Sequence, residues 1–440
     1  MPLRRKFKMY VSDCIDINNE GHLTVGGCDT VALAKEFGTP VYVFDENEIR
    51  KNLRTFRDSM KEYYGGNGLA VYASKAFNCK EMCRICAREG TGIDVVSGGE
   101  LYTALSVGFP AENIVFHGNN KTYAELCAAV ENGVGRIVVD NIDELEMLSR
   151  IAAEQGKTAG IMFRIKPGID AHTHDFIKTG QIDSKFGFAL ETGEAMDAVK
   201  KALATPNVKL RGLHCHIGSQ IFDIDPFELA AKVMLELYKA VKDETGAELE
   251  ELNLGGGFGI KYLESENPKP YGEYMKNVSA IVKEYCEKLG LKMPFVLIEP
   301  GRSVVGAAGL TLYTVGSVKK IPDIRTYVSI DGGMTDNPRY ALYHADYEVV
   351  CANKANEERN EVVTVAGKCC ESGDLIQENT KLQAVEAGDI LAVLSTGAYN
   401  YSMSSNYNRI PRPPVVMVKD GEARVVVRRE TYADVANCDI

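Results

Sequence analysis

The sequence has no apolar run that approaches the roughly 18 residues of a membrane-spanning helix. It also lacks an excess of positive charge, because 50 Lys and Arg stand against 61 Asp and Glu, for a formal net charge of -11. This balance argues against a surface for nucleic acids or anionic membranes, but it leaves room for a local basic pocket that binds one phosphate. The basic N-terminal stretch MPLRRKFKMY is not followed by an apolar segment. We therefore expect a cytoplasmic protein without nucleic-acid or membrane partners.

A second CxxC pair is absent, although the chain contains 12 cysteines. Cys83 and Cys86 form the only such spacing, so a zinc site is not expected, and their helix-forming neighbours predict one face of a helix. In a long chain without a secretory signal, we expect the cysteines to be reduced thiols. No internal repeat or low-complexity tract is evident. The length of 440 residues suggests two or three domains, or one long barrel with an appendage.

Short apolar runs alternate with amphipathic helical stretches in the larger part of the chain. The runs predict eight buried strands, at residues 69–73, 92–95, 113–116, 136–139, 160–165, 209–216, 251–254 and 294–298. Helical stretches lie at residues 46–63, 80–89, 123–132, 142–154, 195–203, 227–241 and 274–289. Eight such units over about 250 residues are typical of an α/β protein with a (β/α)8 TIM-like barrel, and a doubly wound open sheet is the structural alternative. We place this domain at residues 46–302.

After Gly301 the sequence changes to Val-, Thr- and Tyr-rich strands separated by turn residues. The predicted strands lie at residues 311–318, 326–330, 347–350, 361–366, 389–394, 415–419 and 423–428. Two β-like pieces, at residues 22–25 and 41–44, precede the barrel, with a helical segment at 31–37 between them. We therefore predict a second, mainly β domain of the sandwich or barrel type, made of residues 1–45 and 303–440.

Polar residues lie at the ends of the predicted barrel strands, which is where the catalytic residues of such barrels are found. Lys75 follows the first strand, so its ammonium lies at the edge of an apolar sheet, either solvated or held for Schiff-base chemistry. The other residues of this kind are Asp94, His117, Asp140, Arg164, His214, His216, Gly255 to Gly257 and Glu299. Each of them alone could be a polar residue that merely ends a strand. Together they predict an active site on one rim.

A glycine run, Gly255-Gly256-Gly257-Phe258-Gly259, follows the seventh strand. Its backbone N–H groups are not shielded by side chains, so they form either a nest for a phosphate oxygen or a tight turn. The spacing differs from the GxGxxG dinucleotide fingerprint. With Ser219 and Arg302 after neighbouring strands, the run predicts a phosphate clamp. A phosphate beside a Schiff-base lysine indicates pyridoxal 5'-phosphate (PLP).

His214 and His216 lie two residues apart on one strand and face the same side, as a metal-dependent hydrolase would require. An amidohydrolase-like barrel, however, has its His pair on strand 1 and an Asp at strand 8, where this chain has Lys75 and Glu299. A metal site is therefore the less favoured alternative. The polar segment after the fifth strand, with His172 and His174, is predicted to be a loop over the rim.

The acid Glu299 has a mechanistic consequence. A carboxylate against a pyridine nitrogen keeps that nitrogen protonated, so the ring accepts the electrons released when a bond at Cα breaks. An acid at this position favours decarboxylation, whereas an alanine-racemase-like barrel has an arginine there.

Nine motifs, found in order from about residue 40 to 415, resemble the meso-diaminopimelate decarboxylase family of fold-type III PLP enzymes. They are Tyr72-Ala-Ser-Lys75-Ala, Asp94-Val-Val-Ser-Gly-Gly-Glu-Leu, His117-Gly-Asn-Asn-Lys, His214-Cys-His-Ile-Gly-Ser-Gln220, Gly255-Gly-Gly-Phe-Gly, Glu299-Pro-Gly-Arg302, Asp331-Gly-Gly-Met, Cys370-Glu-Ser-Gly-Asp374 and Thr396-Gly-Ala-Tyr399. The resemblance implies PLP as cofactor, decarboxylation of meso-2,6-diaminopimelate to L-lysine, and a homodimer with shared active sites.

The resemblance also implies roles for individual residues. Lys75, Cys370, Glu299 and His216 would be catalytic, with Lys75 as cofactor anchor and His216 stacked on its ring. The cofactor-binding residues would be Lys75, Asp94, His216, Ser219, Gly255, Gly256, Gly257, Glu299, Gly301, Arg302 and Tyr399. The substrate-binding residues would be Arg302, Arg339, Tyr343, Glu371 and Tyr399, and no metal is expected. Cys370 and Glu371 would enter the site of the partner subunit.

Elementary chemistry agrees with these roles. The distal end of the substrate needs cations for its carboxylate and an anion for its ammonium, which Arg302, Arg339 and Glu371 supply. The thiol of Cys370 can deliver a proton, because thiols in general titrate nearer neutrality than the hydroxyl groups of Ser or Tyr. Without the motif, Arg339 could be a surface ion pair and Cys370 a buried small residue. Related decarboxylases of ornithine, arginine or carboxynorspermidine remain the alternative, and no role is assigned to Cys369.

Overall fold

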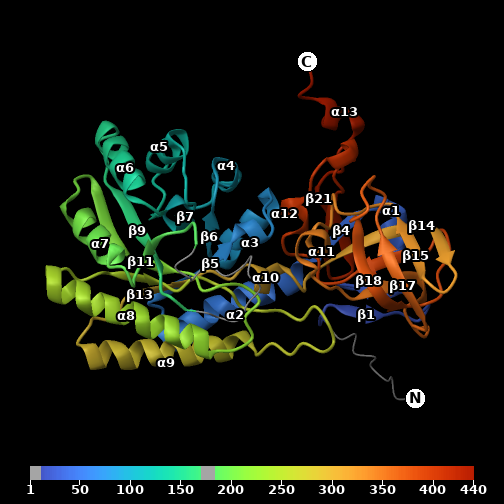
Figure 1. Ribbon diagram of the computed structural model, residues 1–440, viewed down its shortest axis with the longest axis horizontal. Helices are drawn as coiled ribbons and strands as arrows, with labels where there is room; N and C mark the ends of the chain where they lie inside the picture. The colour runs from blue at the N-terminus through green and yellow to red at the C-terminus, as the bar shows by residue number, and fades with distance from the viewer. Residues whose placement is uncertain (1–10, 170–183) are drawn as a thin grey trace. The chain divides into compact units, whose positions relative to one another are not determined.

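The structure, a computed structural model, describes residues 11–169 and 184–440 (Figure 1). The predicted loop histidines His172 and His174 lie outside the described residues. The chain packs into two units: one comprises Asn52–Gly259 and Pro268–Arg302, and the other comprises the segment up to Lys51, Ile260–Asn267 and Ser303–Ile440. We refer to them as the barrel unit and the β unit.

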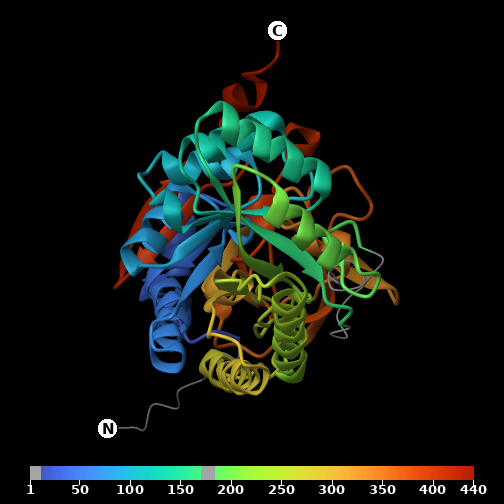
Figure 2. The same ribbon diagram turned by 90° about the vertical axis from the view of Figure 1, so that its left-hand side faces the viewer.

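Eight parallel strands of the barrel unit form a closed sheet within the described residues (Figure 2). They are β5 (Gly68–Ala73), β6 (Gly92–Val95), β7 (Ile114–Phe116), β8 (Arg136–Val139), β9 (Ala159–Lys166), β11 (Val208–Cys215), β12 (Glu251–Asn253) and β13 (Phe295–Ile298). Neighbours pair in chain order, the pairing of β13 with β5 closes the ring, and β10 (Phe188–Ala189) lies beside β9. The predicted (β/α)8 barrel is confirmed, and the open-sheet alternative is wrong.

The barrel strands form where the sequence has short, continuous apolar runs. Every residue of β6, β7 and β8 is buried, as expected for parallel strands covered on both faces. Inside the barrel, five side chains from different strands form a core cluster: Val71, Val115, Val138, Met162 and Leu297. Because side chains fill the interior, the catalytic residues of such a barrel lie at the strand ends.

Helices surround the barrel sheet (Figure 2). They are α2 (Glu46–Tyr64), α3 (Lys80–Glu89), α4 (Gly98–Leu105), α5 (Tyr123–Glu131), α6 (Ile142–Glu154), α7 (Glu194–Ala204), α8 (Asp225–Thr245) and α9 (Tyr271–Leu289), and α10 (Arg302–Val305) follows β13. Several begin at side-chain caps, for example the capping box of Thr122 and Glu125 at α5 and the Asn141 cap at α6. Cys83 and Cys86 lie buried on α3 as predicted, and burial raises the pKa of Cys83 to about 12.

A buried ion network joins three strands at their amino-terminal halves. Glu251, the first residue of β12, accepts two hydrogen bonds from the guanidinium of Arg136 at 2.7 and 2.9 Å. Arg211 of β11 lies 2.5 Å from the same carboxylate. Because catalytic groups of such barrels lie at the opposite, carboxyl-terminal ends, this network serves stability.

The β unit is built around a sheet in the order β18-β17-β15-β14-β4-β20-β21. Its strands are β4 (Val41–Asp45), β14 (Gly309–Ile321), β15 (Arg325–Ile330), β17 (Glu361–Ala366), β18 (Leu375–Leu382), β20 (Val415–Lys419) and β21 (Glu422–Val427), while β16 (Val349–Cys351) pairs with β19 (Ile390–Val393), which also pairs with β14. The N-terminal strand β4 lies between β14 and β20, so an N-terminal segment contributes a strand to this mainly β unit.

The remaining elements of the β unit are short. A small sheet is formed by β1 (Ile15–Ile17), β2 (Leu23–Val25) and β3 (Cys28–Asp29), and the helices are α1 (Thr30–Phe37), α11 (Arg339–Tyr343), α12 (Asn400–Met403) and α13 (Tyr432–Ala436). Two apolar clusters fill this unit, one around Val41, Leu312 and Val416 and the other around Tyr313, Val349 and Val365.

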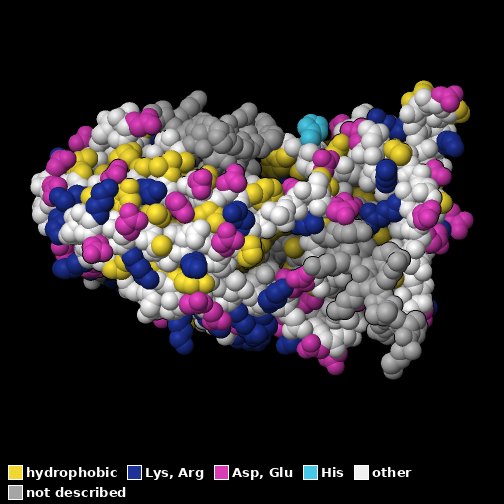
Figure 3. All heavy atoms as spheres, turned by 90° about the horizontal axis from the view of Figure 1, so that it is seen from below, with side chains coloured by type: hydrophobic (Ala, Val, Ile, Leu, Met, Phe, Trp, Pro, Cys, Tyr) yellow, Lys and Arg dark blue, Asp and Glu magenta, His cyan; other side chains and the backbone are white. Residues whose placement is uncertain are grey.

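All 12 cysteines lie in the described residues and are free thiols, as expected. In the described ranges, no helix combines the length and apolar character needed to cross a bilayer. On the face shown in Figure 3, acidic and basic side chains are interspersed rather than gathered into a field of one sign.

Candidate active site

Lys75 lies just beyond the carboxyl end of β5, in the short 3-10 helix Ser74–Ala76, and its side chain is exposed. The backbone N–H of Ser74 donates to Asp94 Oδ1 at the end of β6, at 3.1 Å. Burial raises the pKa of Asp94 well above its usual range, the charge of Glu299 raises it further, and the ammonium of Lys75 opposes both. The predicted lysine, Asp94 and Glu299 therefore interact electrostatically at one rim of the barrel.

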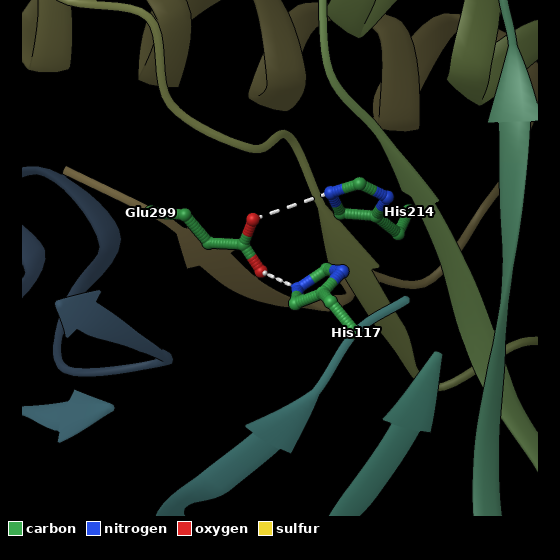
Figure 4. Close-up of side chains that lie close together, drawn as sticks. All are labelled: His117, His214 and Glu299. Atoms are coloured by element: carbon green, nitrogen blue, oxygen red, sulfur yellow. Dashed lines mark hydrogen bonds and ion pairs between the residues drawn. The ribbon is translucent and has the colours of Figure 1, made fainter. Parts of the chain in front are cut away.

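The carboxylate of Glu299, which follows β13, accepts three hydrogen bonds (Figure 4). Its Oε1 accepts from His117 Nε2 at 2.6 Å and from Asn253 Nδ2 at 2.7 Å. Its Oε2 accepts only the longer bond from His214 Nε2, at 3.2 Å. The two short bonds saturate Oε1, so Oε2 is the oxygen with capacity left for another donor.

The two histidine partners keep Glu299 charged. Burial alone would raise the pKa of this carboxyl, but His117 and His214 outweigh burial and hold the pKa well below its usual range. Burial lowers the pKa of His214 to about 4, so at neutral pH this ring is an uncharged N–H donor. The carboxylate is thus a fixed anion inside the barrel rim.

The structure gives the two histidines of the metal alternative different partners. His214 donates to Glu299, whereas His216 Nδ1 accepts from the backbone N–H of Gly256 at 3.4 Å. The grouping of His117, His214 and Glu299 has donor atoms close enough for an ion. Both histidines, however, already meet the Glu299 carboxylate at hydrogen-bond distance. His214 and His216, the pair of the less favoured metal alternative, therefore do not share a partner.

The glycine run forms a backbone turn next to the loop that carries Ser219. Gly255 and Gly257 have φ of +66° and +121°, which other residues rarely adopt. A Cβ on Gly257 would lie 2.7 Å from the carbonyl oxygen of Gly218, so the two loops touch. Arg302 Nη2 donates to Ser219 Oγ at 3.0 Å. A guanidinium, a hydroxyl and side-chain-free backbone form a suitable cradle for a phosphate.

Gly301 and His216 complete the predicted cofactor residues of the barrel unit. A Cβ on Gly301 would lie 2.9 Å from Ala73 Cβ at the end of β5, so only glycine permits this close approach. His216 is half-buried beyond the end of β11, where burial, followed by the charge of Lys75, lowers its pKa well below the usual range. The ring is therefore neutral at neutral pH, which suits a stacking role.

The other predicted residues lie in the β unit. Arg339, at the start of α11, is buried, donates to the hydroxyl of Tyr347 at 2.7 Å and lies over the ring of Tyr262 at 4.8 Å. It is not a surface ion pair, so that alternative is wrong. Tyr343 ends α11 and is half-buried. Tyr399 has φ of +71°, an uncommon conformation for a non-glycine residue that is concentrated at functional sites.

Cys370 and Glu371 are exposed, so the alternative of a buried small residue at Cys370 is also wrong. The neighbouring Cys369 is buried, and its thiol bonds to Asp374. Burial, and then the charge of Asp374, raise the pKa of Cys369 to about 11. Cys369 is therefore a packed, un-ionised thiol at neutral pH.

The predicted site set omitted the three donors to Glu299. His117 and His214 stood among the strand-end residues without an assigned role, and Asn253 was missed altogether. Asn253 is fully buried between two leucines of an apolar run. A buried polar residue in such a run requires a partner, which is the signal that could have identified it.

Comparison with known proteins decides the family. The family model described as "Pyridoxal-dependent decarboxylase, pyridoxal binding domain" matches residues 46–306. The chain belongs to the pyridoxal-dependent decarboxylase family. Diaminopimelate decarboxylase of Halalkalibacterium halodurans is 50% identical over 424 residues, covering 96% of each chain. That of Bacillus methanolicus is 51% identical over 422 residues, covering 96% of this chain and 98% of the relative.

A solved structure agrees with this assignment. The diaminopimelate decarboxylase of M. jannaschii, in complex with L-lysine, has a TM-score of 0.90 and 38% sequence identity, covering 98% of both chains. This pyridoxal-dependent decarboxylase is a PLP-dependent carboxy-lyase, as the sequence motifs predicted. The cofactor fits the residues of the barrel unit: an amine in Lys75, a fixed anion in Glu299, and a cradle at Ser219 and Arg302.

Proposed function

We propose that this enzyme removes CO2 from meso-2,6-diaminopimelate and releases L-lysine, the last step of lysine biosynthesis. Relatives that are 50% and 51% identical over nearly the full length carry the name diaminopimelate decarboxylase. The structural observation that carries the proposal is the Glu299 carboxylate with its three donors. A fixed anion favours decarboxylation over racemisation, because it stabilises a protonated pyridine nitrogen.

When bound, PLP supplies the electron sink for the bond that breaks at Cα. We propose that Lys75 is the amine that holds its aldehyde, with Asp94 beside it, and that His216 stacks on the ring. Glu299 would hold the proton on the ring nitrogen through Oε2, its less occupied oxygen. Ser219, Gly255, Gly256, Gly257, Gly301 and Arg302 would bind the phosphate or shape its surroundings, with Tyr399 against the cofactor.

The remaining residues are proposed to serve the substrate. Arg302 and Arg339 would bind carboxylates, Glu371 would bind the distal ammonium, and Tyr343 and Tyr399 would contact the substrate. A planar guanidinium suits a carboxylate because it donates two parallel N–H bonds. The Cys370 thiol would transfer its proton to the carbon that has lost CO2.

We further propose that the enzyme is a cytoplasmic homodimer, in which Cys370 and Glu371 of one protomer serve the site of its partner. The exposure of both side chains within a single chain supports this arrangement. The functional domains would be residues 46–302 for PLP binding and residues 1–45 with 303–440 for the β domain.

The substrate is tested by incubating the PLP-loaded enzyme with meso-2,6-diaminopimelate or with L-ornithine and measuring CO2 release. We expect kcat/KM for ornithine to be lower by about 10^4-fold, because a site built to bind a polar group rejects an analogue that lacks it by about that factor. Arg339, buried against Tyr262 and Tyr347, is the group that would lose its carboxylate partner. Release from ornithine but not from meso-2,6-diaminopimelate would overturn the substrate assignment.

The shared site is tested by mixing two inactive variants, Lys75→Ala and Cys370→Ala, and allowing the subunits to reassort. If each site takes Lys75 from one protomer and Cys370 from the other, mixed dimers carry one intact site. We expect about a quarter of the wild-type rate, because half of the two-fold dimers are mixed and half of their sites are intact. A rate no higher than that of the separate variants would count against site sharing.

A further inference from the structure

The side chain of Asp374 is enclosed by backbone of the β unit, and its residue exposure is only 3%. Its Oδ1 accepts from the N–H of Met334 at 2.6 Å, and its Oδ2 accepts from the N–H of Cys369 at 2.7 Å. The carbonyl oxygen of Asp374 also accepts from the N–H of Gly367 at 2.9 Å. One aspartate therefore joins the segment after β15 to the loop between β17 and β18.

Two glycines make room for this carboxylate. A Cβ on Gly333 would lie 2.4 Å from Asp374 Oδ2, and a Cβ on Gly367 would lie 2.2 Å from the same oxygen. Neither glycine has a positive φ, so their backbone conformation does not require glycine. Glycine is required instead because the carboxylate approaches so closely. This gives a physical reason for Gly333, the second glycine in the motif Asp331-Gly-Gly-Met.

The loop held in this way carries Cys370 and Glu371. The N–H of Cys370 donates to Asn408 Oδ1 at 2.8 Å, and the N–H of Glu371 donates to the carbonyl oxygen of Cys369 at 2.8 Å. The N–H of Lys368 donates to the carbonyl oxygen of Gly332 at 2.9 Å. The backbone of the loop is thus fixed from several sides, while the side chains of Cys370 and Glu371 are exposed.

We infer that Asp374 is a positioning residue: its enclosed carboxylate holds the loop 369–374 so that Cys370 and Glu371 are presented to the active site of the partner subunit. This inference rests on the proposed function, in which Cys370 supplies the proton. A proton donor is effective only at hydrogen-bond reach, so a shift of its loop slows the reaction although Asp374 does not touch the substrate.

The first test replaces Asp374 by Asn, which keeps the shape of the side chain but has only one oxygen acceptor. One of the two N–H groups, of Met334 or Cys369, then faces an amide NH2. We expect faster hydrogen exchange at these two amides and a kcat lower by about 10- to 100-fold, as for misplaced catalytic groups. Unchanged exchange together with a wild-type kcat would overturn the inference.

Asp389→Asn is the matched control. Asp389 is also a buried carboxylate of the β unit, and it accepts from Asn353, Lys354 and the N–H of Glu386. Its loss removes hydrogen bonds and an ion pair from the same unit but leaves the loop 369–374 intact. We expect this variant to keep the wild-type kcat and the wild-type exchange at Met334 and Cys369.

The second test uses mixed dimers to separate a loop defect from general damage. Asp374→Asn mixed with Lys75→Ala should recover about a quarter of the wild-type rate, because one site then has both an intact lysine and an intact loop. The same variant mixed with Cys370→Ala should recover nothing, since every site then has a defective loop. Recovery in the opposite pattern would overturn the inference.

Gly333→Ala provides an independent variant if Asp374→Asn does not fold. Its methyl group would displace the carboxylate while all its hydrogen-bonding atoms remain. It should show the same exchange and mixing pattern as Asp374→Asn, and normal exchange with a wild-type kcat would contradict the inference. If Lys75→Ala and Cys370→Ala themselves fail to complement, the shared site is wrong, while hydrogen exchange still tests whether Asp374 holds the loop.

Discussion

Lys75→Ala is expected to abolish turnover and to remove the visible absorbance that PLP gains when it is joined to the protein. Lys75 is exposed just beyond the end of β5, and its charge acts on both Asp94 and His216. Loss of the amine leaves the cofactor without its covalent anchor, so we expect kcat/KM to fall by about 10^4-fold or more, the scale on which loss of a covalent catalytic group acts.

The measurement is the absorbance spectrum of the PLP-incubated protein together with CO2 release from meso-2,6-diaminopimelate. Lys80→Ala is the control, because Lys80 is an exposed lysine at the start of α3, five residues further along the chain. This control should keep both the spectrum and the rate. A Lys75→Ala protein with wild-type turnover would remove the basis of the proposed mechanism.

Glu299→Gln is expected to lower kcat by about 10^2- to 10^3-fold, the usual cost of removing one preorganised charge-stabilising group. The amide has no negative charge to hold a proton on the ring nitrogen. Its NH2 group would also face one of the donors His117, Asn253 or His214 in a buried site. We expect the protein to bind PLP with a changed pH dependence of its absorbance, which a purely structural defect would not produce.

The pH profile of the wild-type enzyme follows from the same contacts. An acid whose pKa is lowered by folding contributes stability above its unfolded pKa and loses this contribution as the pH falls through its folded pKa. Because the pKa of Glu299 is held well below the usual range, this carboxylate stays charged as the pH falls to about 5. The absorbance of the PLP-loaded enzyme should therefore show no transition caused by protonation of Glu299 as the pH falls to about 5.

Glu251→Gln serves as the control for Glu299→Gln. Glu251 is an equally buried carboxylate of the barrel, but it binds Arg136 and Arg211 in the amino-terminal halves of the strands. Breaking a buried ion pair on one side costs about 3–5 kcal/mol, so this variant should unfold at a lower temperature. The folded protein should keep its wild-type kcat. A loss of kcat equal to that of Glu299→Gln would indicate a general packing defect in both variants.

The barrel could be predicted because its strands are buried on both faces. Such strands appear in the sequence as short continuous apolar runs, and the predicted runs agree with the eight barrel strands to within about one residue at each end. β18 was missed because its sequence, LIQENTKL, is mostly polar, and α4 was missed because it begins at two glycines that are typical of a loop. In both cases tertiary packing overrides local preference.

The placement of single charged residues at strand ends was predictable, whereas the contacts that support them were not. Lys75 and Glu299 are recognisable as charged residues at strand ends. The bonds from His117 and Asn253 to Glu299 join three different strand ends, and no pattern within one segment shows them. The same holds for Asp374 and Gly333, which meet across two loops of the β unit.

The position of β4 also has a consequence for how the chain folds during synthesis. β4 (Val41–Asp45) pairs on one side with β14 and on the other with β20, and both partners follow the whole barrel in the chain. When the ribosome has finished the barrel, this apolar strand therefore still has two unpaired edges. Unpaired strand edges promote aggregation, so β4 is exposed to this risk until β20 has been translated.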